Sequence, residues 1–138
     1  LQEEFLPLAT LVTPNLDETE ILLSRKLRSR AELPGAAREI YERFGCAVLV
    51  KGGHLRDDAE AVDVFFDGQV VREYSARRIP GVSTHGTGCT YSAAIAASLA
   101  RGESLATAVA SAKSFITRAI SASYRVRRHF ALNHCARR

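Results

Sequence analysis

An α/β fold is predicted by three observations on this chain of 138 residues. Short apolar runs typical of buried strands alternate along the chain with segments of helical spacing. The pair Asp67-Gly68 separates two extended runs and is a strong signal for a β-hairpin. A loop rich in glycine, serine and threonine, Gly81–Gly88, leads into a long segment of small residues. Buried strands that alternate with helices favour a layered α/β architecture.

The first part of the chain is predicted to hold two buried strands and two helices. The apolar run Leu6–Thr13 is expected to be the first strand. Asp17–Leu27 is expected to be a helix, because its first residues are acidic and complement the helix dipole. A second helix opens at Pro34 and stops at Gly45, which are favoured start and stop residues. The run Cys46–Val50 then predicts a strand buried on both faces.

The second part is predicted to hold a hairpin and two helices, and no linker divides the chain. The hairpin would pair Ala61–Phe66 with Gln69–Ser75, and the helices would span Cys89–Ala100 and about Leu105–Tyr124. The end of the chain is expected to be irregular. Two parallel-type strands and a hairpin make a reduced sheet for four helices, so the arrangement is typical of part of a larger fold.

Composition excludes several classes of protein. Hydrophobic residues make up 46% and charged residues 25% of the chain, which excludes disordered and collagen-like classes. No apolar run approaches the roughly 20 residues that span a bilayer, and the acidic start is unlike a secretory signal. Three widely spaced cysteines do not form a disulfide framework. We therefore expect a cytoplasmic protein with no membrane partner.

The formal net charge of +4 owes much to arginines near the end of the chain. A basic stretch can bind nucleic acid, but aromatic residues do not interleave here in the pattern of a stacking platform. A solvated helix end is therefore favoured, and no nucleic-acid partner is expected. The cysteines and four histidines lack the spacing of a zinc site, so none is expected either.

The sharpest chemical feature is the segment THGTGCT, Thr84–Thr90, which leads into the long helix. Its two glycines let the backbone turn tightly and approach a ligand. The first amides of a helix have no partners within it, and with the helix dipole they form a site for phosphate oxygens. A thiol at Cys89 would feel the same field, which favours the thiolate. The alternative is a tight turn with a small buried cysteine; a P-loop is excluded, because Thr87 stands where that motif requires lysine.

Two further segments place polar residues at the ends of predicted strands. Asn15 and Glu18 lie where a strand passes into a helix, near the carboxyl end at which ligands of open α/β sheets bind. Their oxygens suit Mg²⁺, often through its waters. The alternative is a capping box, with Asn15 as the N-cap and Glu18 as its partner. Lys51 directly follows the second buried strand and would contact a phosphate as a point charge, or else lie in a surface turn.

Taken together and in order, these motifs resemble one family. The segments TPNLDE, LVKGGH and THGTGCT, followed by SAAIAASLARG and AVASAKSFITRAI, are similar to those of the hydroxymethylpyrimidine/phosphomethylpyrimidine kinases of thiamine biosynthesis. That family belongs to the ribokinase-like superfamily, so the resemblance implies a three-layer α/β/α fold. It runs from about Leu6 to about Ile120, with a weaker likeness at His129–His134. There Arg128, Phe130 and Ala131 replace the usual glycine and proline.

The resemblance implies catalytic roles for the residues of the glycine-rich loop. Gly86, Thr87 and Gly88 would form the anion hole for the transferring γ-phosphoryl group of ATP. Cys89 would stand where the general base activates the substrate hydroxyl. Phosphoryl transfer depends mostly on positioning and on stabilisation of charge, so this division of roles is chemically reasonable.

The resemblance also implies a set of cofactor-binding residues. Asn15 and Glu18 match the N-x-x-E element that organises Mg²⁺ and the phosphates of ATP. These two residues would hold the metal through water. Lys51 matches a residue near the ATP phosphates, and Thr84 belongs to the same nucleotide-binding set. The cofactors implied are therefore ATP and Mg²⁺.

Enzymes of this family are about twice as long as this chain. Residues 1–138 would therefore be the C-terminal, nucleotide-binding half of the kinase domain, with the N-terminal, substrate-binding half absent. The reduced sheet and the absence of methionine agree with this expectation. The implied reaction is ATP-dependent phosphorylation of 4-amino-5-hydroxymethyl-2-methylpyrimidine and of its monophosphate.

Two other functions stay open at the level of the sequence. Some enzymes with this cysteine-containing loop phosphorylate pyridoxal, and the residues that would decide the substrate lie in the absent half. A non-catalytic remnant or binding module is the second alternative. The partners expected are a small pyrimidine substrate and either a second copy of the chain in a homodimer or the missing N-terminal half.

Overall fold

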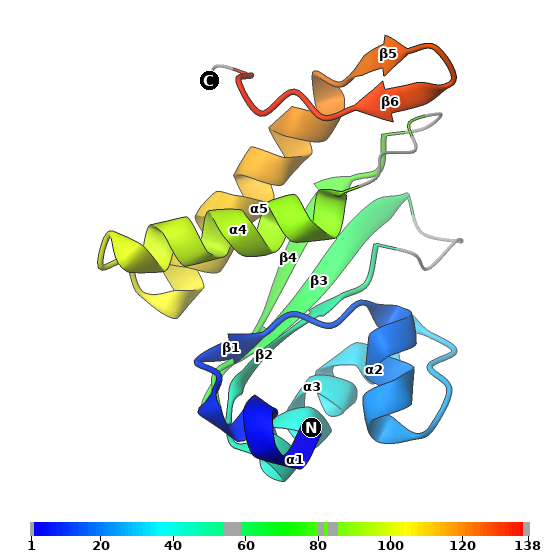
Figure 1. Ribbon diagram of the computed structural model, residues 1–138. Helices are drawn as coiled ribbons and strands as arrows, with labels where there is room; N and C mark the ends of the chain where they lie inside the picture. Colours follow the sequence, from blue (N-terminus) through cyan, green and yellow to red (C-terminus); the bar gives the residue numbers. More distant parts are fainter. Residues whose placement is uncertain (1, 54–58, 80–81, 83–85, 137–138) are drawn as a thin grey trace. The chain divides into compact units, whose positions relative to one another are not determined.

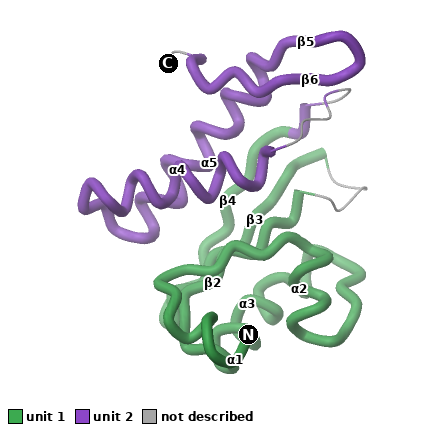
Figure 2. Tube along the Cα trace, viewed as in Figure 1, with its two compact units in different colours: residues 1–77 green, residues 78–138 purple. Residues whose placement is uncertain are grey.

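The computed structural model describes residues 2–53, 59–79, 82 and 86–136 of the chain (Figure 1). The chain forms two compact units, residues 1–77 and 78–138 (Figure 2). The first unit contains a sheet with its helices, and the second contains two long helices and a hairpin. Each unit carries some of the candidate functional residues.

A four-stranded mixed sheet of order β1-β2-β3-β4 is the framework of the first unit. β1 (Leu11–Val12) pairs in parallel with β2 (Ala47–Lys51), and β3 (Glu60–Phe66) and β4 (Val71–Arg77) follow as an antiparallel hairpin. The predicted α/β class, with two parallel strands and a hairpin, is therefore confirmed. The register places Lys51 opposite Asp63 on neighbouring strands.

The first strand is much shorter than predicted. Instead of a strand over Leu6–Thr13, a short helix α1 (Gln2–Phe5) is followed by a 3-10 turn η1 (Leu6–Leu8) that has Pro7 in its first turn. The ring of proline fixes φ near the helical value and removes a backbone donor, which favours a helical start over a strand at this position. Within the predicted strand Leu6–Thr13, only the two residues of β1 pair with the sheet.

Helices α2 (Leu16–Leu23) and α3 (Leu33–Phe44) follow the predicted order. α2 ends earlier than the predicted Leu27, because Ser24 adopts a left-handed conformation with φ 53° and its N–H bonds back to the helix carbonyls. A 3-10 turn, η2 (Arg30–Glu32), precedes α3. α3 stops as predicted at Gly45, whose φ is 71°.

The core of the first unit lies between α3 and one face of the sheet. The alternate residues Val48 and Val50 of β2, with Val64 and Phe66 of β3, face this core because side chains of a strand alternate between its two faces. α3 contributes its buried stripe to the same cluster: Leu33, Ala36, Ala37, Ile40 and Phe44. Leu49 and Lys51 of β2 therefore belong to the opposite face.

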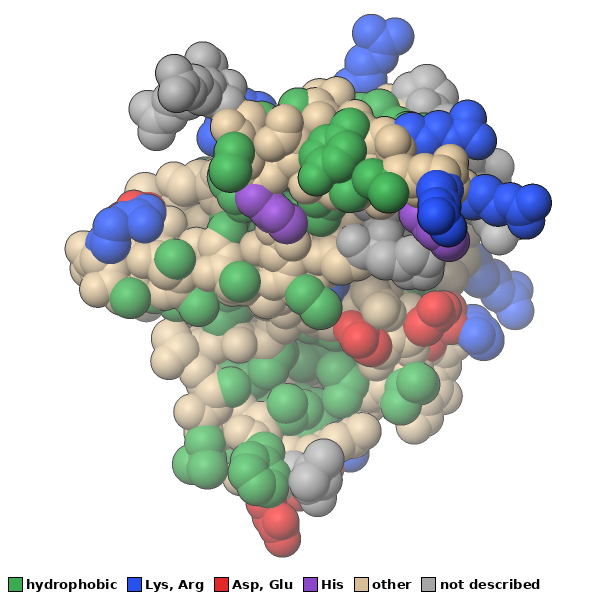
Figure 3. Space-filling view, turned by 45° about the horizontal axis from the view of Figure 1, so that its top comes forward, with side chains coloured by type: hydrophobic (Ala, Val, Ile, Leu, Met, Phe, Trp, Pro, Cys, Tyr) green, Lys and Arg blue, Asp and Glu red, His purple; other side chains and the backbone are tan. Residues whose placement is uncertain are grey.

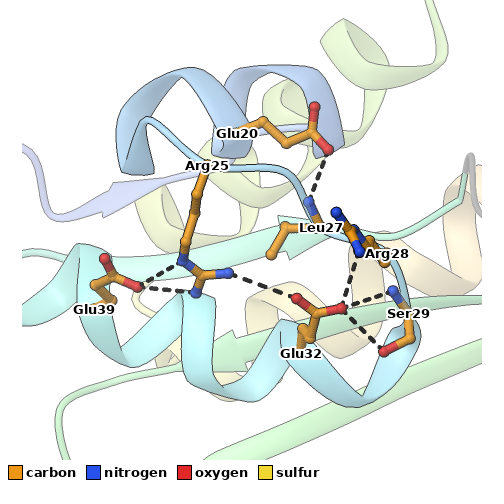
Figure 4. A network of polar contacts seen from close by, with 7 residues as sticks. All are labelled: Glu20, Arg25, Leu27, Arg28, Ser29, Glu32 and Glu39. Atoms are coloured by element: carbon orange, nitrogen blue, oxygen red, sulfur yellow. Dashed lines mark hydrogen bonds and ion pairs between the residues drawn. The ribbon is translucent and has the colours of Figure 1, made fainter.

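A polar network fixes the connection between α2 and α3 (Figure 4). The Glu32 carboxylate accepts the backbone N–H groups of Arg28 and Ser29, each at 3.0 Å. The hydrogen bond from the Arg28 N–H is the main reason that the pKa of Glu32 lies below its usual range. Arg25 joins this network to α3 by donating to Glu39 at 2.9 Å. The connection is therefore ordered by these hydrogen bonds together with the burial of Leu27 in the core.

The second unit is built on an antiparallel helix pair. α4 spans Thr87–Ala100 and α5 spans Leu105–Ser121, with the break at Arg101-Gly102 as predicted. Gly102 has φ 83°, and the Ser104 side chain caps α5 by accepting the N–H of Thr107. Within the described ranges, no helix is both long and apolar enough to cross a membrane.

The end of the chain is not irregular, as had been expected, but forms a second hairpin. β5 (Tyr124–Val126) pairs antiparallel with β6 (His129–Ala131) across a turn at Arg127 and Arg128. Arg127 adopts φ 54° without being glycine or asparagine, so the turn carries no usual sequence signal. Arg127 and Arg128 are both exposed. Figure 3 shows several Lys and Arg side chains gathered on the right of the molecule in that view.

The turn between β3 and β4 depends on glycine at position 68. Gly68 has φ 91°, and a β-carbon there would lie 2.3 Å from the hydroxyl oxygen of Tyr41 in α3. We expect Gly68→Ala to lower the free energy of unfolding by about 2–4 kcal/mol, through left-handed strain and overpacking. Urea unfolding measures this.

The matched control is Gly35→Ala in α3. A β-carbon at Gly35 meets nothing within 4 Å, and the position is helical, so alanine should stabilise by about 0.5–1 kcal/mol. Equal unfolding midpoints for the two variants would contradict the described turn.

Candidate active site

The ends of the parallel strands bring two predicted site residues together. The N–H of Lys51 donates to the carbonyl oxygen of Pro14 at 2.8 Å, and Asn15 forms a parallel bridge with Lys51. Asn15 follows β1 and Lys51 ends β2, so both lie at the carboxyl edge of the parallel pair. Ligands of open α/β sheets bind at this edge.

Asn15 and Glu18 form a complete capping box at the start of α2. The Asn15 Oδ1 accepts the N–H of Glu18 at 2.8 Å, and the Glu18 Oε2 accepts the N–H of Asn15 at 2.7 Å. The capping alternative is therefore confirmed. The cap uses only one carboxylate oxygen of Glu18, Oε2, and the Glu18 side chain is exposed.

The residue that follows Lys51, Gly52, lies close to the backbone of β3. At Gly52 a β-carbon would lie 2.3 Å from the carbonyl oxygen of Val62, so the backbone rests directly on β3. The Gly52 N–H donates to the Val62 oxygen at 3.0 Å and points to Oδ1 of Asp63 at 3.2 Å. In the described part of the chain, no ion pair involves the Lys51 ammonium.

Asp63 is a residue of this region that the sequence analysis did not single out. It is 4% exposed and lies opposite Lys51 in the register of β2 and β3. A buried carboxylate is costly unless it is hydrogen-bonded, so it marks a fixed polar position. The signal that could have found it is the acidic residue inside the apolar run AVDVFF.

The first turn of α4 carries the other predicted residues. Gly86 is the N-cap, with φ 82° and no side chain to cap the helix. The first intrahelical bond runs from the N–H of Thr90 to the Gly86 carbonyl oxygen at 2.9 Å, so the amides at Gly88 and Cys89 have no acceptor within the helix. The Cys89 side chain is exposed. Helix α4 begins before the predicted Cys89, and Thr84 lies outside the described residues.

A second contact in this unit joins α4 to the end of the chain. Oγ1 of Thr90 lies 3.1 Å from Nε2 of His134. The sequence analysis did not include His134 among the site residues, because hydrogen bonds between distant segments leave no local pattern. Thr90 and His134 also line, with Phe115 and Arg118, a groove of about 500 Å³ between α4 and α5.

The three cysteines occupy different environments. Cys46 is buried, and burial raises the pKa of its thiol, whereas Cys89 and Cys135 are exposed. The alternative of a buried cysteine at position 89 is therefore wrong. Among the residues that the structure describes, no group of three histidine, cysteine, aspartate or glutamate side chains could hold a metal ion.

The fold places the chain in the ribokinase-like class of α/β proteins. The chain belongs to the phosphomethylpyrimidine kinase family, whose model matches residues 1–133. This confirms the family to which the sequence motifs pointed.

Among relatives, the hydroxymethylpyrimidine/phosphomethylpyrimidine kinase of Rhizobium meliloti (strain 1021) is 49% identical over 127 residues. The match covers 91% of this chain and 47% of that protein. The kinase of the same name from Aquifex aeolicus is 41% identical, and 48% of its length is covered. The chain thus spans about half the length of these curated relatives.

Among solved structures, the pyridoxal kinase of Bacillus subtilis in complex with ADP has a TM-score of 0.91 at 36% identity. The alignment covers 99% of this chain and 54% of that chain. The pyridoxal kinase of Staphylococcus aureus in complex with AMP-PCP and pyridoxal has a TM-score of 0.89 at 35% identity, over 96% of this chain and 50% of that chain.

The environments of the cysteines predict their reactivity. We expect a thiol-reactive disulfide reagent to modify Cys89 and Cys135 rapidly in the folded protein and Cys46 only on unfolding. The raised pKa of Cys46 also leaves it a smaller thiolate fraction than an ordinary cysteine has at the same pH, so its labelling should rise at higher pH. Absorbance of the released thiolate measures the rates.

Cys46→Ala is the control variant, which should retain both fast-reacting thiols. Three fast-reacting thiols in the unsubstituted protein would contradict the burial of Cys46.

Proposed function

We propose that this chain is the phosphoryl-transfer half of a hydroxymethylpyrimidine/phosphomethylpyrimidine kinase. The parent enzyme would transfer the γ-phosphoryl group of ATP to the hydroxymethyl oxygen of 4-amino-5-hydroxymethyl-2-methylpyrimidine, and a second phosphoryl group to the monophosphate. The observation that carries the proposal is the uncapped first turn of α4, which presents Cys89 at its surface. Family membership over residues 1–133 supports it.

In this proposal the first turn of α4 stabilises charge and accepts a proton. The amides at Gly88 and Cys89 would donate to the oxygens of the transferring group, and Gly86 and Thr87 complete the anion hole. The substrate hydroxyl oxygen attacks the γ-phosphorus, the bond to the bridging oxygen breaks, and ADP leaves. The hydroxyl proton would pass to Sγ of Cys89.

The residues at the strand ends would bind the nucleotide. Lys51 contributes a positive charge for the ATP phosphates, and Thr84 belongs to the same proposed set. The donor set of Asn15 and Glu18 fits Mg²⁺ bound through water, because Glu18 keeps its Oε1 outside the capping box. The metal, when bound, would neutralise phosphate charge.

The named complexes of the structural neighbours support ATP as the phosphoryl donor, since they contain ADP or AMP-PCP. We also infer that the parent enzyme works in the cytoplasm on a small molecule. A homodimer remains a prediction. So does the division of the kinase domain into this half and an N-terminal half that binds the pyrimidine.

A pyridoxal kinase is the second candidate, and the structural neighbours favour it. Both of the solved structures described above are pyridoxal kinases, and one of them contains pyridoxal. The ratio of kcat/KM for the two substrates, measured on the full-length parent protein, decides between them. A larger value for the hydroxymethylpyrimidine supports the first proposal, and a larger value for pyridoxal replaces it.

Cys89→Ser tests the proposed base. In the full-length parent, we expect kcat to fall by about 10²-fold or more, because the hydroxyl is a much weaker acceptor of the proton. Isothermal titration should show ATP affinity nearly unchanged. Cys135→Ser is the matched control at another exposed cysteine and should retain full turnover. Unchanged kcat in Cys89→Ser would remove Cys89 as the base.

Glu18→Gln separates the capping role of Glu18 from its proposed role toward Mg²⁺. The amide oxygen can still accept the Asn15 N–H, so the free energy of unfolding should stay within about 0.5 kcal/mol. Loss of the charge should weaken Mg-ATP binding by about tenfold, or about 1.4 kcal/mol, in calorimetric titration.

Asn15→Ala provides the contrast, since it removes the cap and should lower stability by about 1 kcal/mol. If Glu18→Gln binds Mg-ATP as tightly as the parent, Glu18 serves only as a cap.

A further inference from the structure

We propose that His134 is a positioning residue for the phosphoryl-transfer turn, because it holds the first turn of α4 through Thr90. The proposal rests on the proposed function, since it assigns His134 a role in that same site. Its structural basis is the contact between Nε2 of His134 and Oγ1 of Thr90, at 3.1 Å.

Thr90 is well placed to transmit this contact. It follows Cys89 directly in the chain, and its own N–H closes the first turn of α4 on the carbonyl oxygen of Gly86. One residue therefore bonds through its backbone to the glycine turn and through its side chain to His134. A shift of Thr90 moves the amides and the thiol beside it.

The backbone that carries His134 is fixed on both sides. Leu132 is 9% exposed, and the Asn133 N–H donates to the carbonyl oxygen of Ala119, near the end of α5, at 3.1 Å. The Asn133 side chain accepts the N–H of Cys135 at 3.1 Å. The imidazole is thus presented to α4 from a segment anchored on α5, after the chain has passed through the hairpin β5–β6.

The start of α4 needs such an anchor more than those of α2 and α5 do. α2 and α5 are held at their starts by the side chains of Asn15 and Ser104. α4 begins at Gly86 without a side-chain cap and has a second glycine, Gly88, in its first turn. Glycine leaves the backbone freer than other residues do, and helix ends fray. Donors that stabilise a transition state act best when they are held in place before reaction.

His134 is exposed, so its replacement should leave the core intact. We expect His134→Ala and Thr90→Val, each made in the full-length parent protein, to lower kcat by about tenfold through misplacement of the reacting groups. The double variant should be no slower than either single variant, because the two side chains act through one contact. His134→Gln, which retains a hydrogen-bonding group, should recover part of the rate.

His129→Ala is the matched control, because His129 is an exposed histidine of β6 in the same C-terminal segment. It should leave kcat unchanged. Multiplicative losses in the double variant would overturn the proposal, since they indicate that the two side chains act independently. Equal losses in His129→Ala and His134→Ala would also overturn it, since they indicate a general effect on the segment.

A second readout needs no turnover and separates this proposal from the proposed function. The rate of alkylation of Cys89 by iodoacetamide, followed by mass spectrometry, should change at least about threefold in His134→Ala and not in His129→Ala. If the parent lacks kinase activity but this difference is observed, the positioning role stands and the proposed function falls. If the parent is an active kinase and neither kcat nor alkylation differs between the two variants, the positioning role falls.

Discussion

The parallel pairing of the two-residue strand β1 with β2 is the interaction on which the site of the first unit depends. It is extended by the backbone hydrogen bond from Lys51 to Pro14 and by the parallel bridge that sets Asn15 beside Lys51. α2 begins at Asn15, so this same junction determines where the carboxylate of Glu18 lies. The rest of β2 is buried on both faces and gives this short pairing a rigid support.

The two units use helix starts in opposite ways. In α2, the side chain of Asn15 accepts the N–H of Glu18, so the group exposed at the start of the helix is the Glu18 carboxylate. In α4, the N-cap Gly86 has no side chain, and the amides at Gly88 and Cys89 have no acceptor within the helix. The first arrangement suits a cation and the second suits an anion, and a phosphoryl-transfer enzyme needs both.

The sequence predicted the elements that carry local signals. The helix end at Gly45 and the turn at Asp67-Gly68 were predicted correctly from their turn residues. The buried run Cys46–Val50 was predicted correctly as well, since most of it lies in β2. Each of these signals depends on neighbouring residues only. The strand predicted over Leu6–Thr13 was mostly wrong, since an apolar run does not distinguish a strand from a proline-led turn. The hairpin at the end was missed because its turn has arginines in place of glycine. Among site residues, Asn15, Glu18, Lys51 and Cys89 follow from motifs, whereas Asp63 and His134 depend on pairing between distant segments.

The close approach at Gly52 has a consequence for how this region can vary. A side chain at Gly52 would meet the backbone oxygen of Val62 at 2.3 Å, and a backbone atom cannot rotate away as a side chain can. At Gly53 the nearest neighbour of an added β-carbon is the side chain of Ala61 at 3.9 Å, which is ordinary contact. In a library of random substitutions, position 52 should therefore retain glycine while position 53 accepts other residues. Substitutions after Lys51 can therefore begin at Gly53, two residues beyond the strand end, without moving the lysine.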